Sequence, residues 1–308
     1  DSIKIKADQF LNDAPAPLEK LYYEGLLDTD PRRVKTVKCL QDVNKVVYFI
    51  YASYADDSQC YGNKAASVVS AWAETYHPTG NTINEHKFTA MFWAYHLFQQ
   101  HFTDKEKSKV EAWIRAIARK QINRTSTPNN NWEAKRLKLI ATAGCILEDE
   151  NLKSYAHEGF LRYIHTAYYP DGTSNDLRRR DALHYHVSGM KPAISTFVNC
   201  APLDPRFDLF YHSSPEGASI YRSVLFTLPY ATGEKEHKEW VHSKVRLDKK
   251  RAEAGLKKYQ PGMLFDPRKA RPLFAWAAYY QSEWYTLMKG NNAHERYTSS
   301  WTGLLNSP

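Results

Sequence analysis

One segment of the chain has the residue types that could take a proton from carbon and return it to a leaving group. It covers residues 171–186 and reads DGTSNDLRRRDALHYH. A guanidinium beside a phenol favours the phenolate form, which makes a tyrosine a usable base near neutral pH. We expect one helix here, on which residues about two turns apart share a face. The stripes are then Arg178, Asp181 and Tyr185 on one face and Arg180 and His184 on another. The alternative is a solvated surface helix with Arg–Asp pairs.

Two further polar clusters precede this segment and fit the same chemistry. They read GNTINEH over 80–86 and PNNNW over 128–132. Each alone is most often a helix cap. Together the three clusters suit elimination from a uronate, because the weakly acidic C5 proton leaves only if donors neutralise the adjacent carboxylate. Asn, His and Arg side chains can be those donors. One tyrosine can then serve as base and acid if the proton and the leaving group lie on the same face.

In this order the three clusters resemble the alginate lyase domain family of α/α-toroid polysaccharide lyases. The later run TGEKEHKEWVHSK over 232–244 resembles that family as well. The resemblance implies a catalytic tyrosine that follows an arginine, with an asparagine and usually a histidine that neutralise the carboxylate. Tyr185 matches the tyrosine, and Asn131 is the best match for the asparagine, with Asn130 close behind.

The arginine and the histidine of the resemblance are less sharply assigned. Arg178, seven residues before the tyrosine, matches the arginine, and Arg180 is a rival in the same motif. Trp132 stands where many of these alginate lyases have the histidine, so the role falls to His184, His186, His86 or His237, or it is dispensed with. This departure points to a branch that resembles lyases of polyglucuronate or related polyuronates.

We therefore expect a polysaccharide lyase that acts on alginate or polyglucuronate. The expected catalytic residues are Tyr185, Asn131, Arg178, His184 and Arg180. The expected substrate-binding residues are Asn130, Trp132, Asn84, His86, His186 and His237, with Trp72 and Tyr76 as weaker candidates that are more often core residues. No cofactor is expected, and no metal, because a His-x-His pair points apart on a helix and no carboxylate-rich ligand set accompanies it.

Helix-period patterns dominate the chain, so we expect an all-α fold and one domain over 1–308. Consecutive helix pairs suit an α/α toroid or an irregular bundle, and we expect a single (α/α) toroid or incomplete barrel of about ten helices. Asp30-Pro31 opens a helix whose apolar face continues to Ile50, and Thr103 caps another. Further helices are expected near 62–76, 85–102, 104–120, 132–148, 150–168, 176–199, 215–230 and 268–289, and the best short strand near Lys244 to Leu247.

The charge balance favours an acidic partner. The net charge is +8, and 21 Tyr and 8 Trp offer rings that suit sugar faces. The basic residues form no nucleic-acid-binding pattern, and no run of about 18 apolar residues suggests a membrane span. We expect an acidic polysaccharide as partner, with neither nucleic acid nor membrane, and leave the oligomeric state open.

The start of the chain and its cysteines bear on where the protein is located. The start at Asp1 without Met is typical of a processed chain, and we expect a secreted or periplasmic location. Cys39 and Cys60 could pair in an oxidising compartment, whereas Cys145 lies in an apolar run and is expected to be a buried thiol.

Two other functional classes are compatible with these residues. A glycoside hydrolase needs two facing carboxylates, for which Asp171, Asp176, Asp181 and Glu85 are candidates. A non-catalytic binder of acidic glycans would show affinity without cleavage.

Overall fold

The computed structural model describes residues 2–56 and 59–287, and helices dominate these residues. The chain divides into two compact units. The first comprises Asp1–Ser126 and Lys138–Tyr155, and the second comprises Thr127–Leu137 and Ala156–Pro308. The boundaries thus fall inside α8 (Asn131–Ile146) and α9 (Glu150–Ala167). The single domain over 1–308 stays a prediction.

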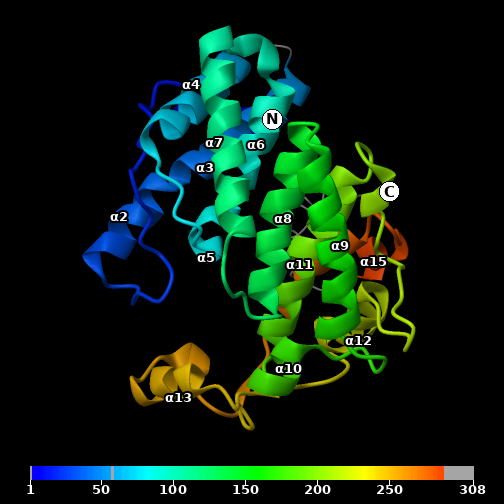
Figure 1. The fold of residues 1–308 in the computed structure, drawn as a ribbon. Coiled ribbons are helices and arrows are strands. Elements are labelled where there is room, and N and C mark those ends of the chain that lie inside the picture. Colours follow the sequence, from blue (N-terminus) through cyan, green and yellow to red (C-terminus); the bar gives the residue numbers. More distant parts are fainter. Residues whose placement is uncertain (1, 57–58, 288–308) are drawn as a thin grey trace. The chain divides into compact units, whose positions relative to one another are not determined.

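The first unit is built around α4 (Gln59–Thr75), which packs against α3, α6 and α7 (Figure 1). Its other elements are α1 (Ser2–Phe10), α2 (Pro31–Cys39), α3 (Gln41–Ala55), α5 (Thr82–Glu85), η1 (His86–Phe88), α6 (Thr89–Leu97), η2 (Gln99–His101) and α7 (Asp104–Ile122). Trp72 and Tyr76 belong to the core of this unit, with 0% and 2% exposure. Trp72 donates its indole N–H to Asp42, and Tyr76 donates its hydroxyl to Glu85. The prediction that these two rings stack on sugars is therefore wrong.

The second unit is built around α11 (Leu183–Cys200), which packs against α10, α12 and α14. Its other elements are α10 (Asn175–Arg180), η3 (Pro205–Phe207), α12 (Ile220–Thr232), β1 (Lys238–Glu239), α13 (Arg246–Glu253), η4 (Lys257–Tyr259), β2 (Met263–Leu264), η5 (Pro267–Ala270), α14 (Arg271–Ala277) and α15 (Glu283–Leu287).

Residues 238–264 form an excursion that we call the 238–264 segment. Its ends pair as the antiparallel strands β1 and β2, and α13 and η4 lie between them. Figure 1 shows α13 set apart from α11 and α12. The strand expected at Lys244 to Leu247 is wrong, because α13 begins at Arg246 and Val245 is its N-cap.

Most expected helices are confirmed, but several are interrupted. The helices expected near 62–76, 104–120, 132–148 and 150–168 appear as α4, α7, α8 and α9, and Thr103 forms a capping box with Glu106. Asp30 caps α2 as expected, yet the helix breaks at Leu40 before α3 begins. The helices expected over 85–102, 176–199 and 268–289 are divided by short turns, and residues 288 and 289 lie outside the described part. Residues 2–56 and 59–287 therefore contain fifteen α-helices instead of about ten.

Two further features of the described chain bear on the predictions. None of its helices combines the length and the apolar character that a membrane-spanning segment needs. Cys39 and Cys145 are free thiols, and Cys145 is buried as expected.

Candidate active site

A sharp break between α10 and α11 shapes the candidate site. Asp181 follows α10 with φ 49°, a left-handed conformation that costs a non-glycine residue about 1 kcal/mol or more. Its carbonyl accepts a hydrogen bond at 2.7 Å from the backbone N–H of Trp240, which is itself left-handed with φ 70°. Its carboxylate accepts from the backbone N–H of His242 at 2.9 Å. The 238–264 segment thus holds the break, and α11 starts in a new direction two residues before Tyr185.

The ring of Tyr185 lies against a guanidinium and an aromatic cluster. The guanidinium carbon of Arg180 is 3.5 Å from the ring centre, and Ala182, Trp240 and Tyr259 form the buried cluster that the ring joins. Arg180 is held by two hydrogen bonds to the buried Asp248, one from Nε at 3.0 Å and one from Nη2. Burial opposes the charge of Arg180, but Asp248 and Tyr185 outweigh it and raise the pKa of Arg180. Arg180 therefore stays charged under the phenol ring.

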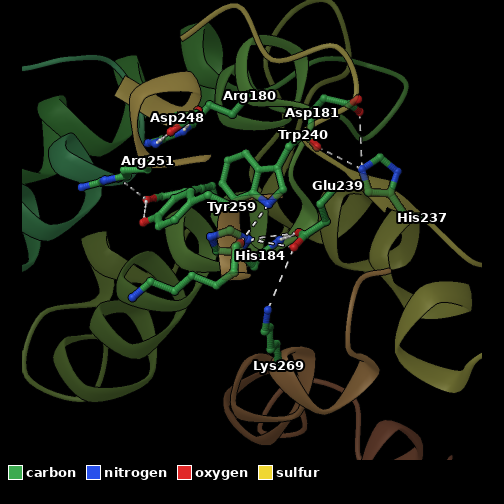
Figure 2. Close-up of polar contacts among 12 residues, drawn as sticks. Arg180, Asp181, His184, His237, Glu239, Trp240, Asp248, Arg251, Tyr259 and Lys269 are labelled. Carbon is green, nitrogen blue, oxygen red and sulfur yellow. Dashed lines mark hydrogen bonds and ion pairs between the residues drawn. The ribbon is translucent and has the colours of Figure 1, made fainter. Parts of the chain in front are cut away.

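Two donors from the 238–264 segment reach the hydroxyl of Tyr185. The hydroxyl of Tyr259 lies 3.3 Å away, and Nη1 of Arg251 lies 3.4 Å away. Figure 2 shows Arg251 beside Tyr259, with Arg180 and Asp248 close by. A negative charge on the Tyr185 oxygen would face two hydrogen-bond donors and a cation under the ring.

His184 lies directly beside the phenol and is fixed by a buried carboxylate. Its ring centre is 4.3 Å from that of Tyr185. Its Nδ1 lies 3.0 Å from Oε1 of Glu239, which also accepts from the backbone N–H of His184 at 2.9 Å. Burial opposes the charge of Glu239, but the His184 contacts outweigh it and lower the pKa of Glu239. Because an ionised Glu239 makes Nδ1 the donor, Nε2 is the ring nitrogen left for a ligand.

Asn131 begins α8 and is locked by charged neighbours. Its backbone N–H and its Nδ2 donate to the two oxygens of Asp176 at 2.8 and 3.1 Å, and its Oδ1 accepts from Nζ of Lys135 at 3.1 Å. A flipped amide would point its carbonyl oxygen at Asp176 and its NH2 group at Lys135, and both contacts would be repulsive. The two charged partners therefore fix this orientation. Asn131 is 2% exposed, and burial raises the pKa of Asp176.

The aspartate that binds Asn131 packs against the face of α11 that carries Tyr185. A β-carbon added at Gly189 would lie 3.4 Å from Oδ2 of Asp176, so the Asp176 carboxylate packs against α11 at this position. Gly189 is four residues after Tyr185 and shares its face. The Asp176 carboxylate that binds Asn131 therefore lies about one helical turn along α11 from Tyr185.

Arg178 lies away from the phenol, and the predicted stripe with Tyr185 is wrong. The stripe required one continuous helix over 176–199, but the break at Asp181 ends α10 at Arg180. Arg178 binds Asp171 at 2.7 Å and Thr173 at 2.7 Å on the surface, and it stacks on Tyr169. The structure places the rival, Arg180, against Tyr185.

Three predicted substrate contacts have other partners. His186 is fully buried and bonded to Ser174 at 2.7 Å, and burial lowers its pKa to about 4. Asn84 is buried, with its amide bonded to the backbone of Leu21 and Glu24. A substrate role for His186 or Asn84 is thus wrong, because neither side chain is accessible. His237 has Nε2 3.3 Å from the Asp181 carbonyl, on the side of Trp240 away from Arg251 in Figure 2.

The remaining candidates are local features of their helix starts. Asn130 accepts from the backbone N–H of Trp132 at 2.9 Å, which is the bond that an N-cap makes. His86 belongs to the first unit, where its Nδ1 lies 2.9 Å from the Ile83 carbonyl. Substrate binding by Asn130, Trp132 and His86 stays a prediction.

Four residues of the site were missed by sequence reasoning: Glu239, Asp248, Arg251 and Tyr259. All four lie in the 238–264 segment, at least 54 residues after Tyr185 in the sequence. The run over 232–244 was noticed, but nothing in it shows that Glu239 contacts His184. Lys249-Lys250-Arg251 reads as an ordinary solvated helix face.

The carboxylates that a hydrolase would need are already engaged. Glu85 accepts from the Tyr76 hydroxyl and the backbone of Thr79 and Gly80. Asp171 binds Arg178 and Asp176 binds Asn131. Among the described residues no group of three or more His, Cys, Asp or Glu side chains could hold a metal ion.

Comparisons with known proteins agree on one likeness. Residues 6–237 match a family model described as alginate lyase. An alginate lyase from Bacteroides ovatus has a similar structure, with a TM-score of 0.68 and 16% identity over 96% of this chain and 91% of that one. Alginate lyase A1-III from Sphingomonas species A1 gives a TM-score of 0.53 and 15% identity over 87% of this chain and 92% of that one. A search of curated protein sequences gave no significant match.

A further similar structure is an A1-III variant complexed with a tetrasaccharide. It gives a TM-score of 0.55 and 16% identity, over 87% of this chain and 86% of that one. At such identities the likeness shows the fold, and the predicted all-α, α/α-toroid class is confirmed. The family match ends at residue 237, so the four residues that the 238–264 segment brings to the site lie beyond it.

Proposed function

This chain belongs to the alginate lyase family and is a polysaccharide lyase, and from this premise we propose that it cleaves an acidic polyuronate, alginate or polyglucuronate, by β-elimination. Tyr185 is the proton carrier in this proposal. The observation that carries it is the setting of the phenol, with Arg180 under the ring at 3.5 Å and Arg251 at 3.4 Å from the oxygen.

The proposed reaction is balanced with Tyr185 alone as base and acid. The Tyr185 phenolate takes the C5 proton of the uronate, and the C5–H electron pair becomes the C4–C5 double bond. The bond from C4 to the glycosidic oxygen breaks, and that oxygen receives the proton from the Tyr185 hydroxyl. The products are a new chain end and an unsaturated uronate, and the phenolate is restored.

The charge that builds on the substrate carboxylate needs fixed donors. Asn131 donates one Nδ2 proton to Asp176 and has a second Nδ2 proton for the substrate carboxylate. When the His184 ring carries both protons, Nδ1 donates to Glu239 and Nε2 is left to donate to the substrate carboxylate. Both donors are oriented before substrate binds, which is what lowers the barrier in such sites.

A single proton carrier favours uronates whose C5 proton and C4 oxygen lie on the same face of the ring. Mannuronate and glucuronate share that arrangement, whereas guluronate is the C5 epimer of mannuronate. We therefore expect cleavage of polymannuronate or polyglucuronate and little cleavage of polyguluronate.

The experiment is to incubate the protein with each of these polymers and follow near-ultraviolet absorbance beside reducing ends. Elimination makes one absorbing unsaturated uronate for each new reducing end. New reducing ends without absorbance would identify a hydrolase, and binding without either signal would identify a non-catalytic glycan binder. Either result contradicts the proposal.

The proposal includes a secreted or periplasmic location, where a large acidic polysaccharide is accessible. The family membership supports this, since a polymer-degrading lyase must meet its substrate. Fractionation of the native host with an antibody to this protein tests it, and recovery in the cytoplasmic fraction alone would contradict it.

A further inference from the structure

We infer that Arg251 and Tyr259, both supplied by the 238–264 segment, are positioning residues that make Tyr185 the phenol that ionises and fix its oxygen for proton transfer. The inference rests on the proposed role of Tyr185. It concerns residues beyond the family match, which ends at 237.

The donor and acceptor capacities set the direction of both hydrogen bonds. A guanidinium has donors only, so Nη1 of Arg251, at 3.4 Å, donates to the Tyr185 oxygen. When Tyr185 is a phenolate, its oxygen can only accept, so the Tyr259 hydroxyl at 3.3 Å must donate to it. Two donors then hold the oxygen and leave room for the C5 proton of the substrate.

The two phenols differ in burial and in the charges beside them. Tyr259 is 8% exposed, and burial, with the charge of Tyr185 next, raises its pKa. Tyr185 is only half-buried and has Arg180 against its ring. Tyr259 therefore keeps its proton and stays a donor to the Tyr185 oxygen.

The charges around Tyr185 come from several elements. Arg180 of α10 is offset by Asp248 of α13, and His184 of α11 is bound to Glu239 of β1. Lys258 of η4 lies 5.7 Å from the Tyr259 ring centre. No ion pair involves Arg251 within residues 2–56 and 59–287. Among the described residues, no carboxylate therefore neutralises the charge of Arg251, which lies at the Tyr185 oxygen.

The 238–264 segment holds both residues in place. The indole N–H of Trp240 donates to the Lys258 carbonyl at 3.0 Å and so fixes the turn that carries Tyr259. Gln260 donates to the Ala252 carbonyl at 2.8 Å and ties the same turn to α13. The guanidinium carbon of Arg251 lies 4.8 Å from the Tyr259 ring centre, so the two donors also support each other.

The test is the pH dependence of kcat/KM, measured by absorbance on the polymer that the protein cleaves. Arg251→Gln and Tyr259→Phe should move the acidic limb to higher pH, because the phenolate loses a donor. Each pH unit of movement costs about tenfold in rate on the acidic side, and the rate recovers at higher pH. Arg251→Lys should keep part of the effect of the cation. Lys257→Gln, an exposed neutralisation on the same turn, should leave the profile unchanged.

The opposite results are equally clear. A rate that falls by the same factor at every pH, or a profile that does not move, overturns the inference and assigns these residues a structural role. Circular dichroism of each variant shows whether it folds. If Tyr259→Phe does not fold, the profiles of Arg251→Gln and Arg251→Lys test the inference by themselves. An active Tyr185→Phe protein would overturn the proposed function itself, whereas an inactive one with unmoved Arg251 and Tyr259 profiles overturns only this inference.

Discussion

The second unit contains the same arrangement of an arginine, a tyrosine and an aspartate twice. Arg178 stacks on Tyr169 at 3.4 Å and binds Asp171, while Arg180 stacks on Tyr185 at 3.5 Å and binds Asp248. In the first set the ion pair is solvated, with 44% and 55% of the two side chains exposed. In the second set the values are 12% and 2%.

The comparison shows that residue types alone do not make the site. The two sets have the same groups at nearly the same distance between guanidinium and ring. Only the second set is buried by the 238–264 segment. Burial weakens solvent screening, so the same charges act more strongly there. The surface set stabilises a turn, and the buried set, we propose, tunes a phenol.

The largest expected effect is on activity and uses the two tyrosines as a matched pair. Tyr185→Phe removes the proposed proton carrier and should lower kcat by about 10²- to 10⁴-fold. Tyr169→Phe removes the hydroxyl of another half-buried tyrosine, which donates to Asn175, and should keep kcat within about twofold. Absorbance assays on the cleaved polyuronate measure both, and equal losses in the two variants would remove the distinction between the two sets.

The second prediction compares the free energy of unfolding after loss of each arginine. Arg180→Gln leaves the buried Asp248 without its cation and should cost about 3–5 kcal/mol. Arg178→Gln breaks an exposed pair and should cost less than about 1 kcal/mol. Urea unfolding followed by circular dichroism measures both values. A small cost at Arg180 would show that solvent reaches Asp248.

The sequence predicted the helices better than their interruptions. Apolar periodicity and caps are local, so the helix starts at Pro31, Asp104 and Asn131 were found within a residue or two. The breaks at Leu40 and Asp181 were missed. At Asp181 the reason is tertiary, because the left-handed backbone is held by Trp240 and His242 from far along the chain, and no local signal marks it.

The same limit applies to the candidate site. Tyr185 and His184 lie side by side, and Asn131 binds the aspartate that packs against the same helix, because each motif lies at a helix start of one unit. The choice between Arg178 and Arg180 depended on a continuous helix that does not exist. Arg251 and Tyr259 could not be found, since their contact with Tyr185 depends on how the 238–264 segment folds back.

The third prediction concerns His186, the buried counterpart of His184. Burial lowers the pKa of His186 to about 4 from the model-peptide value of 6.5. Between these pH values the unfolded chain protonates His186 and the folded chain does not. The free energy of unfolding therefore falls as the pH is lowered from 6.5 towards 4. The loss should reach about 3 kcal/mol. His186→Gln should remove this part of the slope when unfolding is measured by urea across that pH range. An unchanged slope would contradict the buried, neutral state.

The smallest expected effect tests the surface set by its response to salt. Burial opposes the charge of Asp171, but hydrogen bonds from Thr173 and Arg178 outweigh it and lower its pKa. The resulting stability is present above the unfolded value of 3.8 and is lost as the pH falls below it. Because the pair is exposed, Asp171→Asn at neutral pH should cost at most about 1 kcal/mol.

That small cost should also shrink in about 1 M salt, where charges are screened within about 3 Å. The buried Asp248 is shielded from ions, so the larger cost of Asp248→Asn should change little between low and high salt. Urea unfolding of both variants at the two ionic strengths measures the difference. If salt reduced both costs equally, the two sets would be equally solvated. Burial would then not be what distinguishes the surface set at Tyr169 from the buried set at Tyr185.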